Sequence, residues 1–270
     1  MGKAQHVKWT REHFLIALNL YCKLPFGKLH RSNPLIIDVA QRMGRTANSL
    51  SMKLCNFAAL DPVQQARGIR GLPGVTRQDR LMWKEFHDNL VSLAPESEQI
   101  LHDLFTDQSN TELDFLHRDR IRFEKKPSRV PIGATEVTVQ TTARRGQQFF
   151  RQAVLNAYGV RCCISGIGVP DLLIASHIKP WRVCSDDRLN LRNGLCLSSI
   201  HDAAFDAGLV TLDEQMRLVL SRDLKSYLPH ALLEQNFTAF EGKRIRLPEK
   251  LAEPDPDLLN YHRSIVFIGL

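Results

Sequence analysis

This sequence lacks the patterns that indicate a zinc-binding, disulfide-rich, membrane-spanning or secreted protein. Its six cysteines include no pair separated by two residues, so neither a zinc knuckle nor a disulfide framework is indicated, and no structural zinc is expected. No apolar run approaches the ~18 residues that a membrane-spanning helix needs. The first residues contain no apolar signal core. We therefore expect a cytoplasmic protein with no membrane partner and with buried, reduced thiols such as Cys162 and Cys163.

Length and charge favour a soluble protein with an acidic partner. The 270 residues suit two or more domains, and 43% hydrophobic residues suffice for their cores. The formal net charge of +7 favours nucleic acid first and an anionic membrane second. Surface solubility alone also accounts for such a charge.

Three short helices are predicted near the start of the chain. The first is capped by Thr10, the second starts after Asn33 and stops at Gly44, and the third runs from Ala47 to about Asn56. A tight turn joins the last two, which is a helix-turn-helix pattern. This trihelical unit resembles Myb-like DNA-binding domains.

The third helix has polar side chains that would reach phosphates or base edges if it entered a major groove. They are Arg45, Asn48, Ser49, Ser51, Lys53 and Asn56. The alternative is a helical interaction bundle whose third helix is merely solvated. Two further helices, at 77–89 and 97–105, complete a helical DNA-binding domain predicted over residues 1–110.

The chain changes character after residue 110. A charged, proline-containing stretch is followed at 135–142 by a polar segment that we expect to be extended. Residues 111–143 are therefore interpreted as a basic linker, or as an arm that lies along DNA. A solvated linker without any contact is an equal alternative.

A helix is predicted from Arg144 to about residue 158. Arg144, Arg145 and Arg151 lie near its start, where guanidinium groups and outward-pointing backbone N–H groups suit a phosphate. Downstream, the pattern predicts strands at 172–178 and 194–197, a short helix at 199–207 and a hairpin at 209–220.

Chemically useful residues gather between residues 175 and 208. His177 ends the first of these strands, and a neutral imidazole with a pKa near 6.5 can take a proton from water. Asn193 lies at the start of the opposing strand. Asp202 and Asp206 are four residues apart on the short helix, so they share one face and can converge on one cation. Carboxylate oxygens indicate a single divalent cation, with Mg²⁺ or Mn²⁺ first in order.

Three blocks in this order are similar to HNH endonucleases, the ββα-metal (His-Me) finger family. The blocks are His177-Ile178 followed by Pro180-Trp181, Asn193-Gly194-Leu195, and His201-Asp202 followed by Phe205-Asp206. The resemblance covers roughly residues 144–221 and includes the basic stretch at 144–151. It implies a C-terminal ββα-metal HNH nuclease domain over 144–270. With the N-terminal all-α helix-turn-helix domain predicted above, the expected fold class is α+β.

The resemblance also assigns expected roles. His177 is the general base, and Asn193 either orients its imidazole or contributes an oxygen to the metal shell. Asp206 is the first candidate metal ligand, followed by His201 and Asp202. His201 lies away from Asp206 on a regular helix, so it either ligates at the first turn or contacts the scissile phosphate.

One position departs from the family pattern. Many HNH enzymes carry Asp or His directly before the catalytic histidine, and here that residue is Ser176. We therefore expect the cation to rest on the short helix, Asn193 and water. Lys179 and Arg182 flank the site and are candidates to hold phosphates. His262, in the tail, is expected to have a packing role.

Together these observations predict a metal-dependent DNA endonuclease that acts on double-stranded DNA, with a helical module that locates the substrate. They suggest restriction or other defence against foreign DNA, with modified DNA among the candidate targets, and a homodimer for cutting both strands. The alternative is a DNA-binding regulator with an inactive HNH domain, for which Ser176 would be the first sign. An RNA- or toxin-type nuclease is a more distant third.

Overall fold

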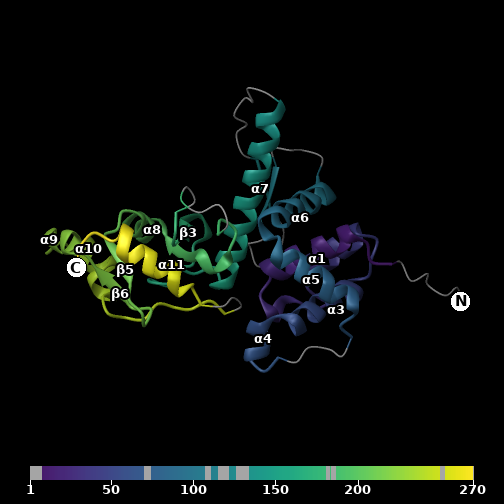
Figure 1. Cartoon of the computed structure of the whole chain (residues 1–270), viewed down its shortest axis with the longest axis horizontal. Helices are drawn as coiled ribbons and strands as arrows, with labels where there is room; N and C mark the ends of the chain where they lie inside the picture. Colours follow the sequence, from purple (N-terminus) through teal and green to yellow (C-terminus); the bar gives the residue numbers. More distant parts are fainter. Residues whose placement is uncertain are drawn as a thin grey trace, which may run out of the picture. The chain divides into compact units, whose positions relative to one another are not determined.

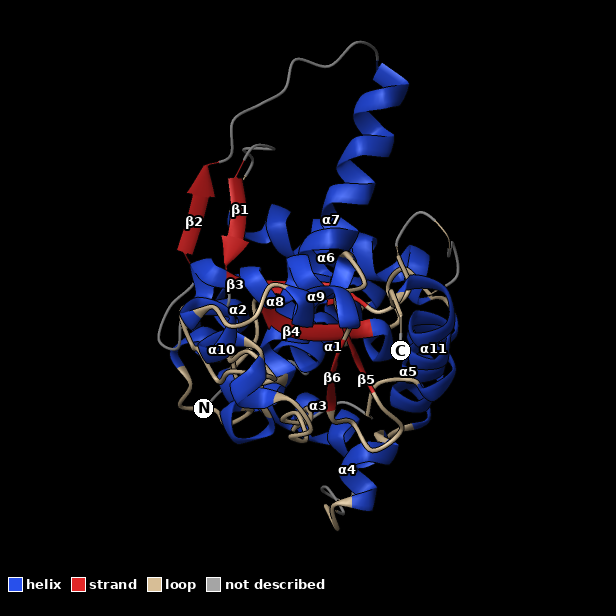
Figure 2. Ribbon diagram, turned by 90° about the vertical axis from the view of Figure 1, so that its left-hand side faces the viewer, coloured by secondary structure: helices blue, strands red, loops and turns tan. Residues whose placement is uncertain are grey.

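The computed structural model describes residues 8–69, 74–106, 111–114, 122–125, 134–180, 183, 187–249 and 253–269 (Figure 1). The chain forms two compact units, residues 1–152 and 153–270. The division falls within the long helix α7 (Ala134–Ala157). Within the described residues, the strands pair as three separate two-stranded ladders among many helices (Figure 2).

The first unit is helical. Its helices are α1 (Arg11–Lys23), α2 (Pro34–Arg42), α3 (Ala47–Leu60), α4 (Pro62–Ala66), α5 (Arg77–Asp88) and α6 (Leu90–Phe105), with a 3₁₀ turn at Phe26–Lys28. Helix α1 is central, because every residue from Phe14 to Lys23 is buried and the helix packs against α3, α5 and α6. The core of this unit therefore surrounds α1.

The predicted helix starts are confirmed by their caps. Thr10 accepts a hydrogen bond from the backbone of His13, which takes the place of the usual glutamate in a capping box. Asn33 and Thr46 cap α2 and α3 in the same way. Gly44 has a φ of +66°, a conformation that glycine adopts without strain, and this allows the tight turn between α2 and α3.

Two helices are longer than predicted. Helix α3 ends at Leu60, four residues beyond Asn56, because buried Phe57 and Ala58 continue its apolar face. Helix α6 starts at Leu90 and contains Pro95, which the sequence pattern treats as a breaker. A proline there removes one backbone donor, and the packing of α6 against α1 compensates for that loss.

The range predicted as a linker contains regular structure. Strand β1 (Thr111–Asp114) pairs antiparallel with β2 (Arg122–Lys125). Helix α7 begins at Ala134, so the segment 135–142 is helical, and its prediction as extended is wrong. Its threonines and valines lower helix propensity by only a few tenths of a kcal/mol each, and the helix continues without a break into the apolar residues after 148.

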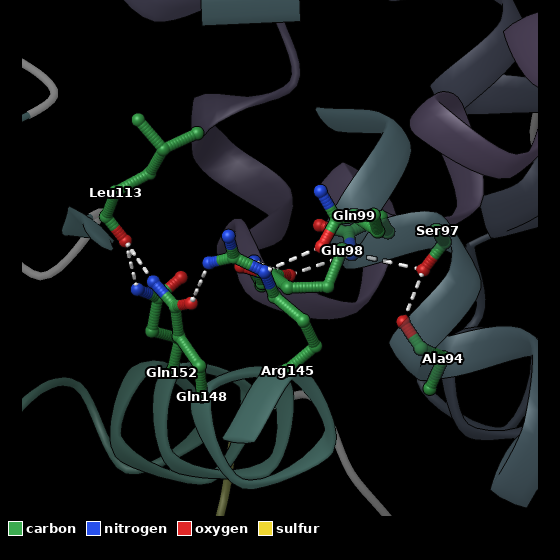
Figure 3. A network of polar contacts seen from close by, with 10 residues as sticks. Ala94, Ser97, Glu98, Gln99, Leu113, Arg145, Gln148 and Gln152 are labelled. Atoms are coloured by element: carbon green, nitrogen blue, oxygen red, sulfur yellow. Dashed lines mark hydrogen bonds and ion pairs between the residues drawn. The ribbon is translucent and has the colours of Figure 1, made fainter. Parts of the chain in front are cut away.

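Polar contacts anchor α7 within the first unit (Figure 3). Arg145 donates from Nε to Gln99 Oε1 at 2.9 Å and from Nη1 to Gln148 Oε1 at 3.2 Å. Gln148 in turn donates to the carbonyl of Leu113 at 2.8 Å. Next to this network, Lys23 and Glu98 form an ion pair whose side chains are 0% and 1% exposed.

The second unit contains the predicted strand, strand and helix. Strand β3 (Leu173–His177) pairs antiparallel with β4 (Gly194–Ser198), in a register that sets His177 opposite Gly194. Helix α8 (Ser199–Asp206) follows β4 directly and packs on both strands. Every residue of β4 is buried, so this ladder lies in the core of the unit.

The rest of the second unit covers this ββα element. The hairpin β5 (Val210–Leu212) and β6 (Leu218–Leu220) lies where it was predicted. Helices α9 (Arg222–Ser226), α10 (Ala231–Asn236) and α11 (Pro256–Tyr261) follow, with 3₁₀ turns at Pro170–Leu172, Leu191–Asn193 and Thr238–Phe240 and a π turn at His262–Val266.

The C-terminal tail packs back on the unit at Gly208. Ile268 donates its backbone N–H to the Gly208 carbonyl at 2.9 Å. A Cβ on Gly208 would lie 2.0 Å from the carbonyl oxygen of Val266, and its φ is +69°. The close approach therefore requires glycine at the end of α8.

Candidate active site

His177 lies at the end of β3 with its ring held by the loop that follows. Its Nε2 is 3.0 Å from the backbone carbonyl of Arg188. Since a carbonyl only accepts, Nε2 carries the proton, and the lone pair of the neutral ring is on Nδ1. Burial lowers the pKa of His177, and the Arg188 carbonyl and the charge of Asp202 only partly oppose this. The imidazole is thus neutral at physiological pH, as a general base requires.

Asn193 fastens the loop between β3 and β4. Its Oδ1 accepts from the backbone N–H of Lys179 at 2.8 Å, and its Nδ2 donates to the carbonyls of Lys179 and Asp187 at 3.2 Å each. The side chain is 0% exposed. Since Asp187 precedes Arg188, Asn193 positions the carbonyl that holds His177. The amide therefore acts on the imidazole through the backbone, and its oxygen is already used by Lys179.

Asp202 and Asp206 lie four residues apart on α8, and the charge of Asp202 acts on His177. Asp202 is half-buried and Asp206 is exposed. Burial raises the pKa of the Asp202 carboxyl, and the nearby Ser176 hydroxyl and His177 partly counteract this. Partial burial and the charge of Asp202 raise the pKa of Asp206. Asp202 is therefore electrostatically coupled to His177 and also to Asp206.

The side chains of the site can supply only part of the oxygen ligands of a hard divalent cation. Water or substrate oxygens would have to complete its coordination. Among the described residues, no three His, Cys, Asp or Glu side chains come together in a way that could hold a metal ion. Asp202 and Asp206 supply carboxylate oxygens, and the buried hydroxyl of Ser176 interacts with the Asp202 carboxyl. Mg²⁺ is commonly bound by one or two carboxylates together with water and phosphate oxygens, so these residues fit it.

His201 is placed in the core of the second unit. Its Nδ1 contacts the Ser198 hydroxyl at 2.7 Å and the Cys162 thiol at 3.5 Å, and its Nε2 lies 2.7 Å from the carbonyl of Asn236. The side chain is 0% exposed. Both ring nitrogens are used inside the protein, so the roles predicted for His201, in ligation or at the scissile phosphate, do not match its position.

Cys162 and His262 also belong to the packing of this unit. Burial raises the pKa of the Cys162 thiol, but contacts with His201 and Ser165 outweigh it and bring that pKa to about 6. His262 stacks on Phe205 with ring centroids 3.7 Å apart, and its Nε2 bonds the Phe205 carbonyl. Burial is the main cause that lowers the pKa of His262 to about 4. The expected packing roles of both residues are confirmed.

The flanking cations differ in their availability. Lys179 is half-buried, and its ammonium lies 5.1 Å from the ring centroid of Tyr261. Arg182 lies outside the described residues. Arg192, the next cation along the loop, pairs with Asp255 at 2.9 Å and remains 44% exposed. Lys179 is thus the nearest described basic candidate along the sequence from His177.

The arginines of α7 are not at a helix start. Helix α7 begins ten residues before Arg144, so the backbone donors around Arg144, Arg145 and Arg151 serve the helix itself. Arg145 is 2% exposed and bonds Gln99 and Gln148. The prediction of a phosphate site there depended on outward-pointing N–H groups, which a helix interior lacks.

Three of the six candidate DNA contacts of α3 are turned inward. Ser51 donates to the Leu29 carbonyl at 2.6 Å. Lys53 pairs with Asp79, and Asn56 donates to the same carboxylate at 3.0 Å. Lys53 and Asn56 thus bind α3 to the start of α5, and Ser51 binds it to the backbone at Leu29. These three side chains are therefore not part of the DNA-contacting surface proposed below.

The other three candidates lie at the start of α3. Asn48 is exposed and Ser49 half-buried. Arg45 is half-buried, with its guanidinium 4.1 Å from the ring centroid of Trp9 and Nη2 donating to the Lys8 carbonyl at 2.7 Å. The exposed face of α3 continues through Met52, which is 47% exposed.

Sequence reasoning missed the backbone part of the site. The carbonyls of Asp187 and Arg188 hold Asn193 and His177, and neither residue belongs to a recognisable motif. Because any residue type can supply a backbone carbonyl, the identities of Asp187 and Arg188 do not reveal these contacts. The length of the loop between β3 and β4 is the only sequence signal for them. Ser176 departs from the family pattern, but the sequence pattern does not reveal that its side chain is buried.

The second unit thus contains a ββα element with a histidine at the end of its first strand and two carboxylates on its helix. Residues 162–213 match the family model described as HNH endonuclease. No curated protein matches the chain. In the described residues, no helix is long and apolar enough to cross a membrane.

Proposed function

We propose that the chain is a DNA endonuclease that hydrolyses phosphodiester bonds with one divalent cation, Mg²⁺ or Mn²⁺. The observation that carries this proposal is the fixed tautomer of His177 near Asp202, within the segment that matches the HNH family. Such an arrangement brings together a base for water and a binding site for a hard cation.

In this proposal His177 removes the proton from the attacking water through Nδ1. The Arg188 carbonyl holds Nε2–H, keeps the ring in this tautomer and stabilises it when it becomes charged. Asn193 keeps that carbonyl in place. Asp202 and Asp206 hold the cation, which when bound neutralises charge that develops on the phosphate oxygens and assists the leaving 3′ oxygen.

We further propose that the helical unit binds double-stranded DNA through the start of α3. The exposed Asn48, the half-buried Ser49 and the net charge of +7 support this. Lys179 is the proposed phosphate contact beside the active site. In biological terms we propose restriction or another defence against foreign DNA, with modified DNA among the candidate targets, and a homodimer that cuts both strands.

A second candidate is a DNA-binding regulator with an inactive HNH domain. One observation favours it: in the described residues, no group of three protein side chains is arranged to hold a metal ion. The first candidate accounts for the same fact, because two carboxylates and water suffice for Mg²⁺ when phosphate oxygens contribute. The fixed neutral tautomer of His177 has no evident use in a regulator.

Incubation of the purified full chain with supercoiled plasmid tests the proposal. Reactions contain Mg²⁺, Mn²⁺ or EDTA, and substrates are unmodified, methylated or hydroxymethylated. We expect nicked or linear DNA with either metal and none with EDTA. Absence of any cleavage with every metal and substrate would favour the regulator. Cleavage of only one substrate class would define the target.

A further inference from the structure

The solvent-facing side of helix α3 carries no charged side chain. Its exposed and half-buried members recur at helical spacing, and they are Asn48, Met52, Cys55 and Ala59. The only charged residue of the helix is Lys53, which is buried in an ion pair with Asp79. Because proteins bind DNA largely through its phosphates, a helix with such a face needs cations from other elements to hold it on a duplex.

Two buried contacts show which elements lie beside this face. Consecutive residues of a helix project about 100° apart, so Ser51 and Lys53 point to either side of Met52. Ser51 donates to the carbonyl of Leu29, in the segment between α1 and α2. Lys53 pairs with Asp79 at the start of α5, which packs against α3 in the first unit (Figure 1). The uncharged face of α3 therefore lies between the α1–α2 segment and the start of α5.

Both of these neighbouring elements present basic side chains to solvent. We call them the flanking cations, and they are Lys28 and Arg31 in the α1–α2 segment and Arg77 and Arg80 on α5. Within the part of the chain that the structure describes, none of the four side chains takes part in an ion pair, a hydrogen bond or an aromatic contact. Residues 24–37 and 74–84 contain a single carboxylate, that of the buried Asp79. The charge of the flanking cations is thus available to an external anion.

Other exposed cations of the same unit are neutralised by carboxylates. Arg11 pairs with Glu85 at 3.2 Å and with Glu96 at 2.5 Å. Arg42 pairs with Asp38 at 3.0 Å. The flanking cations therefore differ from these arginines in their surroundings, although all of them are exposed and carry the same charge.

We propose that the flanking cations bind phosphates of the two strands of a DNA duplex, with the uncharged face of α3 in the major groove between them. A helix with its side chains is about 10 Å across and the major groove of B-DNA is about 12 Å wide. Elements on either side of an inserted helix therefore meet the phosphates that line the groove. This inference rests on the proposed DNA binding of the helical unit and is independent of DNA cleavage.

The experiment measures the salt dependence of DNA binding by the full chain in EDTA, with fluorescence anisotropy. The probe is a labelled duplex of random sequence, because phosphate contacts do not depend on sequence. Each phosphate that a cation neutralises contributes about 0.9 to the slope of log affinity against log salt concentration. The double variants Lys28→Gln/Arg31→Gln and Arg77→Gln/Arg80→Gln should therefore each lower this slope by about 2.

The double variant Arg11→Gln/Arg42→Gln is the matched control. It removes the same charge from exposed residues of the same unit, but from arginines that carboxylates already neutralise. We expect its slope to equal that of the wild type. Because the flanking cations make no side-chain contacts among the described residues, their replacement should also leave the melting temperature unchanged.

An unchanged slope in either variant of the flanking cations would overturn the inference. Equal decreases in all three double variants would also overturn it, because affinity would then follow net charge alone. Tighter binding of the wild type to single-stranded DNA or to RNA than to the duplex would contradict the major-groove arrangement. If the wild type binds no duplex, the proposed DNA binding of the helical unit fails together with the inference. Plasmid cleavage by the same preparation tests the nuclease separately.

Discussion

The Nε2 atom of His177 lies 3.0 Å from the backbone carbonyl oxygen of Arg188, eleven residues further along the chain. This contact with a backbone carbonyl fixes the tautomer of the ring. Asn193 bonds the carbonyl of the preceding residue, Asp187, and so holds the loop in which the acceptor lies. The orientation of the proposed base thus depends on the backbone of a loop and on one buried amide.

The first prediction concerns this amide. Asn193→Ala should lower the turnover number because the Arg188 carbonyl is no longer held against His177. It should also cost about 1–3 kcal/mol of unfolding free energy, since the three backbone groups that Asn193 bonds lose their partner. Plasmid cleavage rates and urea denaturation measure the two effects.

Asn190→Ala is the control for the same loop. Asn190 caps the 3₁₀ turn at Leu191–Asn193 and bonds Asp187, but it does not hold the backbone on both sides of the loop. We expect a smaller loss of activity than for Asn193→Ala. Equal losses in the two variants would contradict the special role of Asn193.

The second prediction concerns the pH dependence of cleavage. Burial lowers the pKa of His177 below its ordinary value near 6.5, and the base is active only when neutral. The value of kcat/KM should therefore be at its plateau at pH 7 and fall only below pH 6.5. A rate that still rises steeply between pH 7 and 8, at constant metal saturation, would be inconsistent with a neutral His177 as the base.

The third prediction concerns His201. Since both of its ring nitrogens are bonded inside the protein, His201→Ala should act on stability, with a loss of about 2–4 kcal/mol from the cavity and the unpaired groups. Folded protein should keep most of its turnover at low temperature. Denaturation curves and rates normalised to the folded fraction test this. A fully folded but inactive variant would restore His201 to the catalytic set.

The fourth prediction uses His262 as a source of acid sensitivity. Its pKa is about 4 in the folded protein against an ordinary value near 6.5, so the unfolded chain binds the extra proton first. Stability should fall as pH drops below 6.5, and by pH 4 this group alone contributes a loss of about 3 kcal/mol. Above pH 6.5 it has no effect.

Urea denaturation at pH 7 and pH 5 measures this contribution. His262→Gln should reduce the difference in stability between the two pH values. His30→Gln, which changes an exposed histidine, should leave it unchanged. An identical pH dependence in the wild type and His262→Gln would show that another group is responsible.

Much of the ββα element could be predicted from sequence because its signals are local. The apolar residues of β3 before His177, the position of Gly194 and the four-residue spacing of Asp202 and Asp206 are each signals that fall within a few residues. The N-caps Thr10 and Thr46 are local in the same sense. The family resemblance placed these elements together, and the match over residues 162–213 supports it.

The roles of other polar residues depended on partners far along the chain. Lys53 was expected to face DNA, but it pairs with Asp79, 26 residues later. His201 was expected near the cation, but the carbonyl of Asn236, 35 residues later, holds its ring. Helical periodicity alone does not reveal such partners, so it cannot tell a solvated polar residue from a buried, paired one.

The central claim is that His177 is the base of a DNA-cleaving site, and its most direct test is the turnover of His177→Ala on plasmid DNA with saturating Mn²⁺. DNA affinity is measured in parallel by fluorescence anisotropy. We predict a turnover about 10²–10⁴ times lower than that of the wild type, with unchanged DNA affinity. Undiminished cleavage by His177→Ala would contradict the account.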